Sequence, residues 1–235
     1  MPDPVTDLVR LVRERIASAA DPDRAEPMRA YMKSALPYRG VTSVPLRAIT
    51  REVVPAYPLP DRAGWESAVL ELWDAAAYRE ERYAALAVAG HRLYRQHRDP
   101  AALDLYRHLV VTGAWWDLVD TIASHHVREI LDRYPTEATP VLERWAVGDD
   151  LWLRRTAMLS QLGRKGSTDL ALLRFTLEQN LEDSLHGREF FTRKALGWAL
   201  RDYARTDPDW VGAFVAEYRD RLSGLSRREA LKHLG

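Results

Sequence analysis

Residues 149–157 read Asp-Asp-Leu-Trp-Leu-Arg-Arg-Thr-Ala, and residues 189–195 read Glu-Phe-Phe-Thr-Arg-Lys-Ala. Both stretches start with an acidic residue, continue with aromatic and apolar residues, and end with two basic residues followed closely by a small one. Helix pairs that recur every roughly 35–40 residues are typical of HEAT-like repeats, which stack into a solenoid with a concave binding surface. We therefore predict an all-α, HEAT-like helical-repeat solenoid; an irregular all-α bundle is the alternative.

Amphipathic helical patterns extend along nearly the whole chain. Val5, Leu8, Val9, Val12 and Ile16 mark the first of them with helical spacing. Proline, glycine and aspartate interrupt the patterns, whereas no alternating β pattern, Asn-Gly turn or Ser/Gly linker occurs. We expect one repeat domain over residues 1–235, with helices near residues 4–20, from 26 onward, 45–54, 62–76, 78–97, 100–112, 115–133, 137–147, 150–163, 168–182, 189–206, 208–221 and 226–234.

Composition excludes several classes of protein. The chain has 34 basic and 34 acidic residues, which argues against a disordered tail and against a globally basic nucleic-acid binder. The balance is uneven, because residues 1–150 hold 19 basic and 23 acidic side chains and residues 151–235 hold 15 and 11. The absence of cysteine excludes disulfides and thiolate chemistry. Since neither a secretory signal nor a membrane span is recognisable, we expect a cytoplasmic protein without membrane contact.

Residues 115–120, Trp-Trp-Asp-Leu-Val-Asp, place two indoles and two carboxylates close together. On a helix, Trp116 and Asp120 are four residues apart and share one face. Asp117 lies near the expected helix start, where a carboxylate suits the helix dipole. Asp120 is either a lone carboxylate that stabilises positive charge or a salt-bridged surface residue. Trp115, like Trp152 and Trp198, either packs in the core or remains exposed.

Motifs for other chemistries are absent. The sequence contains no phosphate-binding glycine loop, no zinc-ligand spacing and no serine nucleophile elbow. His125 and His126 are adjacent, so on a helix they do not converge on one metal ion. We therefore expect neither a metal site nor a cofactor, and carboxylates, aromatic rings and arginines remain as the chemical groups.

Basic pairs recur over four successive predicted helices. If they align on one side of the repeats, they form a stripe that contacts phosphates. The alternative is ordinary solvated helix surface. The pairs are Arg154–Arg155, Arg164–Lys165, Arg193–Lys194 and Arg227–Arg228.

In these features the chain resembles the AlkD-type DNA alkylation repair glycosylases, a HEAT-like repeat family. The resemblance extends from residues 25–33 (Ala-Glu-Pro-Met-Arg-Ala-Tyr-Met-Lys) to residues 225–233 (Leu-Ser-Arg-Arg-Glu-Ala-Leu-Lys-His), in preserved order. Between them lie the Trp-Trp-Asp-x-Val-Asp motif, Leu-Trp-Leu-Arg-Arg at 151–155, and Phe-Phe-x-Arg-Lys-Ala-x-Gly-Trp at 190–198.

The resemblance implies a concave DNA-binding face and a monofunctional glycosylase that excises N3- and N7-alkylated purines from duplex DNA. It implies that Asp120 is the catalytic carboxylate and that Trp116 and Trp198 flank the lesion. It also implies that Arg155 contacts the DNA backbone and that Tyr31 is an N-terminal DNA contact. Gly163 and Thr42 depart from the family pattern, where longer polar or basic side chains occur, and we expect these departures to weaken DNA binding.

The implied reaction fits a single carboxylate. Alkylation at N3 or N7 makes the purine cationic, so the base leaves without a general acid, and an ionised Asp120 would stabilise the oxocarbenium ion and position water. We expect a monomer that associates with the nucleoid when bound to DNA. The rival interpretations are a non-catalytic relative that binds unusual DNA structures and a HEAT-like scaffold for protein partners.

Overall fold

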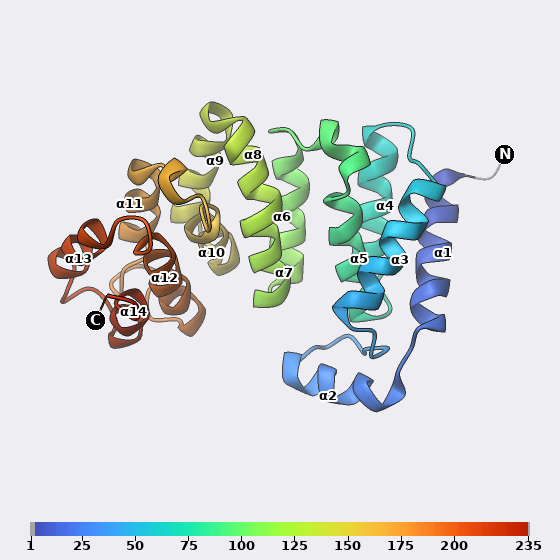
Figure 1. Ribbon diagram of the computed structural model, residues 1–235, viewed down its shortest axis with the longest axis horizontal. Helices are drawn as coiled ribbons and strands as arrows, with labels where there is room; N and C mark the ends of the chain where they lie inside the picture. Colours follow the sequence, from blue (N-terminus) through green and yellow to red (C-terminus); the bar gives the residue numbers. More distant parts are fainter. Residues whose placement is uncertain (1–2, 235) are drawn as a thin grey trace. The chain divides into compact units, whose positions relative to one another are not determined.

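The computed structural model describes residues 3–234, and all regular secondary structure among them is helical (Figure 1). The predicted all-α class is therefore confirmed. The chain divides between Arg98 and Asp99 into two compact units, called unit 1 and unit 2. The expectations of a single repeat domain and of a concave solenoid face stay predictions.

Unit 1 is built around two buried indoles. Trp65 and Trp73 are fully buried on one helix, and the apolar stripe of the first helix, predicted from its spacing, is buried as well. The helices that pack around this core are α1 (Pro4–Ser18), α3 (Ser43–Ala56), α4 (Arg62–Asp74) and α5 (Arg79–Ala89), followed by the 3-10 turn η1 (Arg92–His97).

Helix α2 (Pro22–Met32) is set apart from the four packed helices of unit 1 (Figure 1). Its N-terminal end and the loop that follows it are nevertheless fixed. The Asp21 N–H donates to the Arg39 carbonyl at 2.8 Å, and the buried Glu80 carboxylate accepts the N–H groups of Arg39, Gly40 and Val41 at 2.9 to 3.1 Å. A carboxylate on α5 thus holds the loop that returns from α2.

Gly40 is required in this loop. Its φ of +81° lies in the left-handed region, and an added Cβ would lie 2.0 Å from the Asp21 carbonyl oxygen. We predict that Gly40→Ala lowers the free energy of unfolding by on the order of 1–3 kcal/mol, measured by chemical denaturation. Gly212→Ala is the control, because nothing lies within 4 Å of its Cβ position and alanine favours the helix. Equal stability of both variants would contradict this role of Gly40.

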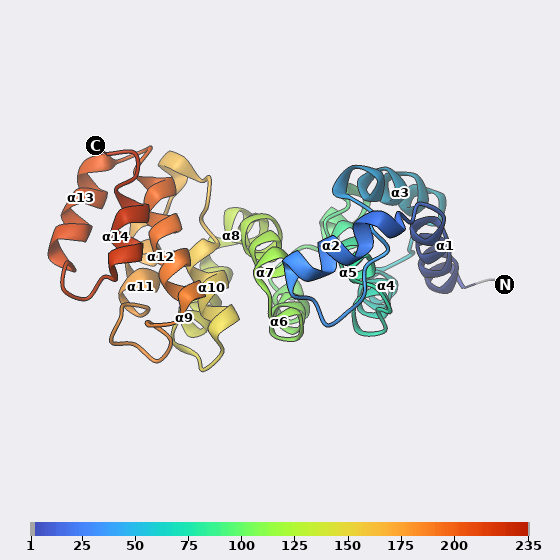
Figure 2. The same ribbon diagram turned by 90° about the horizontal axis from the view of Figure 1, so that it is seen from below.

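Unit 2 has one helix in its middle. Helix α10 (Leu151–Leu159) packs against α6, α7, α9, α11 and α12, and Figures 1 and 2 show it between α7 and α12. The core around it includes Met158, Leu159, Leu173 and Leu196. The other elements are α6 (Ala102–Gly113), α7 (Trp116–Thr121), α8 (Arg128–Arg133), α9 (Pro135–Val147), η3 (Lys165–Ser167), α11 (Leu170–Glu178), α12 (Phe190–Tyr203), α13 (Pro208–Glu217) and α14 (Gly224–Ala230).

The helix expected over residues 115–133 contains a wider turn. A π-helical segment, η2 (Ile122–Val127), joins α7 to α8 and starts two residues after Asp120. The Ser124 hydroxyl donates to the Asp120 carbonyl at 2.6 Å, within this wider turn. The insertion keeps Ile122, Ala123, His126 and Val127 buried, and such turns occur often at functional sites.

Candidate active site

Asp120 lies on the partly exposed face of α7. The preceding helix ends at Ala114, whose φ of 39° is left-handed, and Trp115 is extended, so α7 starts at Trp116. Leu118 and Val119 are fully buried and hold the helix against the core of unit 2. Trp116 and Asp120, four residues apart on this helix, are both partly buried, and their shared face stays a prediction from helix geometry.

Arg155 binds the Asp120 carboxylate with two hydrogen bonds. Its Nε lies 2.7 Å from Oδ1 and its Nη2 lies 2.8 Å from Oδ2. The Arg155 Nη1 donates to the Phe191 carbonyl at 2.6 Å, so α10 joins α7 to the start of α12. The side chain of Arg155 is 3% exposed and that of Asp120 is 14% exposed. The Arg155 guanidinium thus binds Asp120 and the Phe191 carbonyl. The contact of Arg155 with the DNA backbone, which the resemblance implied, stays a prediction.

Burial raises the pKa of the Asp120 carboxyl above its ordinary value, and the negative charge of Asp117 acts in the same direction. The hydrogen bonds and positive charge of Arg155 oppose this shift but do not cancel it. A carboxylate has about four lone-pair sites, of which Arg155 occupies two. Ionised Asp120 consequently keeps acceptor capacity for a water molecule or a positive charge.

A cluster of four aromatic rings adjoins this ion pair; we call Trp115, Trp152, Phe190 and Phe191 the aromatic cluster. The Phe191 ring lies edge-on to Trp115 at 5.4 Å and 5.0 Å from Trp152. The Arg155 guanidinium lies 5.7 Å from the centre of the Phe191 ring. Of the two alternatives for Trp115, the structure shows packing, because its ring contacts Trp152 and Phe191. Phe190 and Phe191 were not predicted as site residues. In their repeat they occupy the positions that Leu151 and Trp152 occupy in the preceding repeat.

Trp198 is half-buried on α12 and packs against the core of unit 2, and Trp116 is half-buried on α7. The glycine before Trp198 permits a close approach of two helices, because an added Cβ at Gly197 would lie 2.6 Å from the Glu229 Cβ. Glu229 on α14 accepts a hydrogen bond from Lys194 at 2.8 Å and pairs with Arg201. The Lys194 hydrogen bond lowers the pKa of Glu229. These contacts fix α12 against α14.

The side chains of the predicted basic stripe form two groups. Some bind other protein groups; the others have no protein partner among the described residues, and we call them the available cations. Arg154 is buried and donates to the Val147, Gly148 and Gln179 carbonyls and to the Asn180 side chain, so protein groups occupy its guanidinium. Three other members have protein partners: Arg164 pairs with Asp132 at 2.7 Å, Lys194 with Glu229, and Arg227 donates to the Arg219 carbonyl. Among the described residues, Lys165, Arg193 and Arg228 have no side-chain hydrogen bond or ion pair.

The remaining predicted positions are Tyr31 and Thr42 in unit 1 and Gly163 in unit 2. Tyr31 lies on α2 of unit 1 and is 76% exposed, as a binding residue must be. Thr42 is the N-cap residue of α3. Gly163 has a φ of +77°, and its N–H donates to Asp202 at 2.6 Å, so its backbone conformation explains why this chain carries glycine there.

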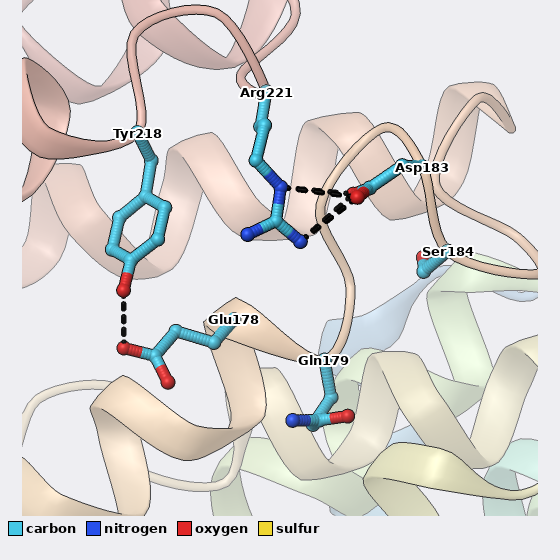
Figure 3. Close-up of a pocket in the computed structure, with 6 residues that line it drawn as sticks. All are labelled: Glu178, Gln179, Asp183, Ser184, Tyr218 and Arg221. Atoms are coloured by element: carbon cyan, nitrogen blue, oxygen red, sulfur yellow. Dashed lines mark hydrogen bonds and ion pairs between the residues drawn. The ribbon is translucent and has the colours of Figure 1, made fainter.

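A polar cavity of about 330 Å³ lies elsewhere in unit 2 (Figure 3). Arg221 pairs with both oxygens of Asp183, and the Tyr218 hydroxyl donates to Glu178 at 2.7 Å. Its charged groups thus satisfy one another, and none of the predicted site residues lines it. The lining residues are Glu178, Gln179, Asp183, Ser184, Tyr218 and Arg221. Within residues 3–234, no group of three or more His, Asp or Glu side chains could hold a metal ion.

Comparisons with known proteins found a matching family model and a similar solved structure. A family model described as DNA alkylation repair enzyme matches residues 12–234. A solved structure described as a predicted DNA alkylation repair enzyme from Enterococcus faecalis is similar, with 27% identity and a TM-score of 0.80 over 92% of this chain and 97% of that one. No curated protein sequence matches. Among the described residues, no helix is long and apolar enough to cross a membrane. Because the family model matches nearly the whole chain, the protein belongs to the DNA alkylation repair enzyme family.

Proposed function

We propose that the protein is a monofunctional DNA glycosylase that excises cationic N3- and N7-alkylated purines from duplex DNA. Its partner is the alkylated duplex, and the reaction needs no cofactor. The observation that carries the proposal is the partly exposed carboxylate of Asp120, which two hydrogen bonds from Arg155 fix beside the aromatic cluster.

A single carboxylate suits a leaving group that is already charged. Hydrolysis of a neutral glycoside commonly uses two opposed carboxyl groups, one of which protonates the leaving group. A purine alkylated at N3 or N7 carries a positive charge and leaves without that proton. Positive charge then develops on the deoxyribose, and ionised Asp120 stabilises it and holds the water that attacks the anomeric carbon.

In this proposal, Trp116 and Trp198 also stabilise the positive charge that develops on the deoxyribose. Their indole faces are electron-rich and attract a cation, which contributes ~0.5–2 kcal/mol for each ring. Arg155 keeps Asp120 in one orientation, so the carboxylate need not reorganise as the glycosidic bond breaks. The aromatic cluster supports Arg155 through Phe191.

Binding of the duplex is proposed to depend on the available cations. Each neutralised phosphate changes the slope of log affinity against log salt concentration by ~0.9. We predict that Lys165→Ala and Arg228→Ala each reduce the slope by about one unit, measured by fluorescence anisotropy over a salt series. Arg10→Ala is the control, because Arg10 is already paired with Asp7 and Glu14. Slopes that are the same in all variants would exclude Lys165 and Arg228 as phosphate contacts.

One incubation separates the proposal from its rivals. The purified protein is mixed with methylated duplex DNA, and released bases are identified by mass. A glycosylase releases 3-methyladenine and 7-methylguanine. A non-catalytic DNA-binding relative retains the DNA without releasing a base, and a scaffold for protein partners does neither; either of these results contradicts the proposal.

A further inference from the structure

Phe190 is the exposed member of the aromatic cluster. It is the first residue of α12 and is 52% exposed, whereas Trp115, Trp152 and Phe191 are each partly buried. Single exposed apolar side chains are common on protein surfaces and need no special role. The surroundings of Phe190 are what distinguish it from the other exposed apolar residues of unit 2.

Phe190 is linked by contacts to the Asp120–Arg155 pair. Its ring lies edge-on to Phe191, with the centroids 5.3 Å apart and the planes inclined by 77°. The Phe191 carbonyl accepts a hydrogen bond from Arg155, which holds Asp120. Only one ring therefore separates this exposed phenyl group from the Asp120–Arg155 pair.

A cation without a protein partner accompanies this ring. Arg193 is three residues after Phe190 on α12, so the two side chains lie on the same side of the helix. The Arg193 guanidinium makes no hydrogen bond or ion pair with a described residue, and its Nε is shielded from solvent. Its counterpart in the preceding repeat, Arg154, makes four hydrogen bonds with protein groups. At this position of the repeat, Arg154 thus binds protein groups, whereas the Arg193 guanidinium stays available for a ligand.

We propose that Phe190 stacks on a nucleobase that is unstacked next to the lesion, while Arg193 binds a phosphate of the same strand. This inference rests on the proposed function. An aromatic face beside a basic group is the combination with which proteins hold unpaired nucleotides, since every base has a face that stacks. The positive charge of Arg193 favours a polyanion over an apolar protein segment as the occupant. Phe190 therefore positions the bound DNA strand and contributes to DNA binding.

The test uses a duplex that binds but is not cleaved. It carries 7-methylguanine on a 2′-fluorinated sugar, whose fluorine opposes formation of the oxocarbenium ion, and 2-aminopurine at one of the neighbouring positions, on the lesion strand or opposite. Stacking of Phe190 changes 2-aminopurine fluorescence at one of these positions. Phe190→Ala is expected to abolish the change and to raise the Kd roughly 5- to 100-fold, whereas Phe190→Tyr retains both signals.

Leu185→Ala is the matched control, because Leu185 is 64% exposed on the loop that precedes α12. It should bind and fluoresce like the wild-type protein. Unchanged signals in Phe190→Ala, or equal losses in Leu185→Ala, would overturn the inference. Phe190→Leu keeps an apolar side chain without a ring, and it should lose the fluorescence change while its thermal midpoint stays that of the wild type.

The two proposals fail separately in this design. If the wild-type protein releases no base from the unfluorinated duplex but Phe190→Ala still loses the fluorescence change, the glycosylase proposal fails and the stacking contact stands. If base release is normal and Phe190→Ala behaves as the wild type, the stacking contact is wrong and the glycosylase proposal stands.

Discussion

Asp120→Asn is expected to slow the release of 7-methylguanine from duplex DNA by ~10²–10³-fold, because that is the effect of removing one preorganised electrostatic group. Asparagine has nearly the same shape, but it lacks the negative charge that stabilises the oxocarbenium ion. Binding of the duplex should persist, since the available cations are elsewhere. The measurement is the single-turnover rate at saturating protein, which separates the chemical step from binding.

Asp117→Asn is the matched control for this substitution. Asp117 lies three residues earlier on the same helix, and its charge raises the pKa of Asp120 only as the least of the contributing causes. We expect a rate close to that of the wild-type protein. A wild-type rate in Asp120→Asn would show that another group performs the chemistry, and the catalytic assignment of Asp120 would be wrong.

Arg155→Gln is expected to produce the second large effect, a loss of rate that depends on pH. In the proposed mechanism the active form of Asp120 is ionised, so the rate should fall as pH decreases through the pKa of this carboxyl. Burial already raises that pKa, and Arg155 is the group that lowers it. Removing Arg155 raises the pKa further, so the acid limb of the pH–rate profile should move to higher pH.

The predicted signature is a rate deficit at neutral pH that shrinks at alkaline pH. Arg154→Gln is the control: this neighbouring buried arginine binds carbonyl groups, so its loss should lower stability without moving the acid limb. An unchanged acid limb in Arg155→Gln would contradict the role of Arg155 in tuning Asp120.

The helical fold was predictable because its signals are local. Apolar spacing identified α1, and its four buried residues are among those that define the pattern. The boundaries were less accurate where proline follows a capping aspartate. The second helix was expected from residue 26 onward, whereas the Asp21 side chain caps α2 and Pro22 starts it. The π-helical turn after Asp120 has no local sequence signal, so it could not be predicted.

The candidate site was predictable only in part. The shared face of Trp116 and Asp120 follows from helix geometry, which the sequence determines. The partner of Asp120 does not, because Arg155 is 35 residues away and reaches it only through the packing of α10 against α7. For the same reason, the sequence could not show that Arg154 binds protein groups whereas the Arg193 guanidinium has no partner among the described residues.

The proposed function depends on hydrolysis of the glycosidic bond of a cationic purine at Asp120. The most direct measurement is mass analysis of both products after the wild-type protein acts on a duplex with one 7-methylguanine. We expect free 7-methylguanine and an uncleaved strand with an abasic site at that position. A strand that keeps the modified base, or one that retains guanine after loss of the methyl group alone, would contradict the proposed function.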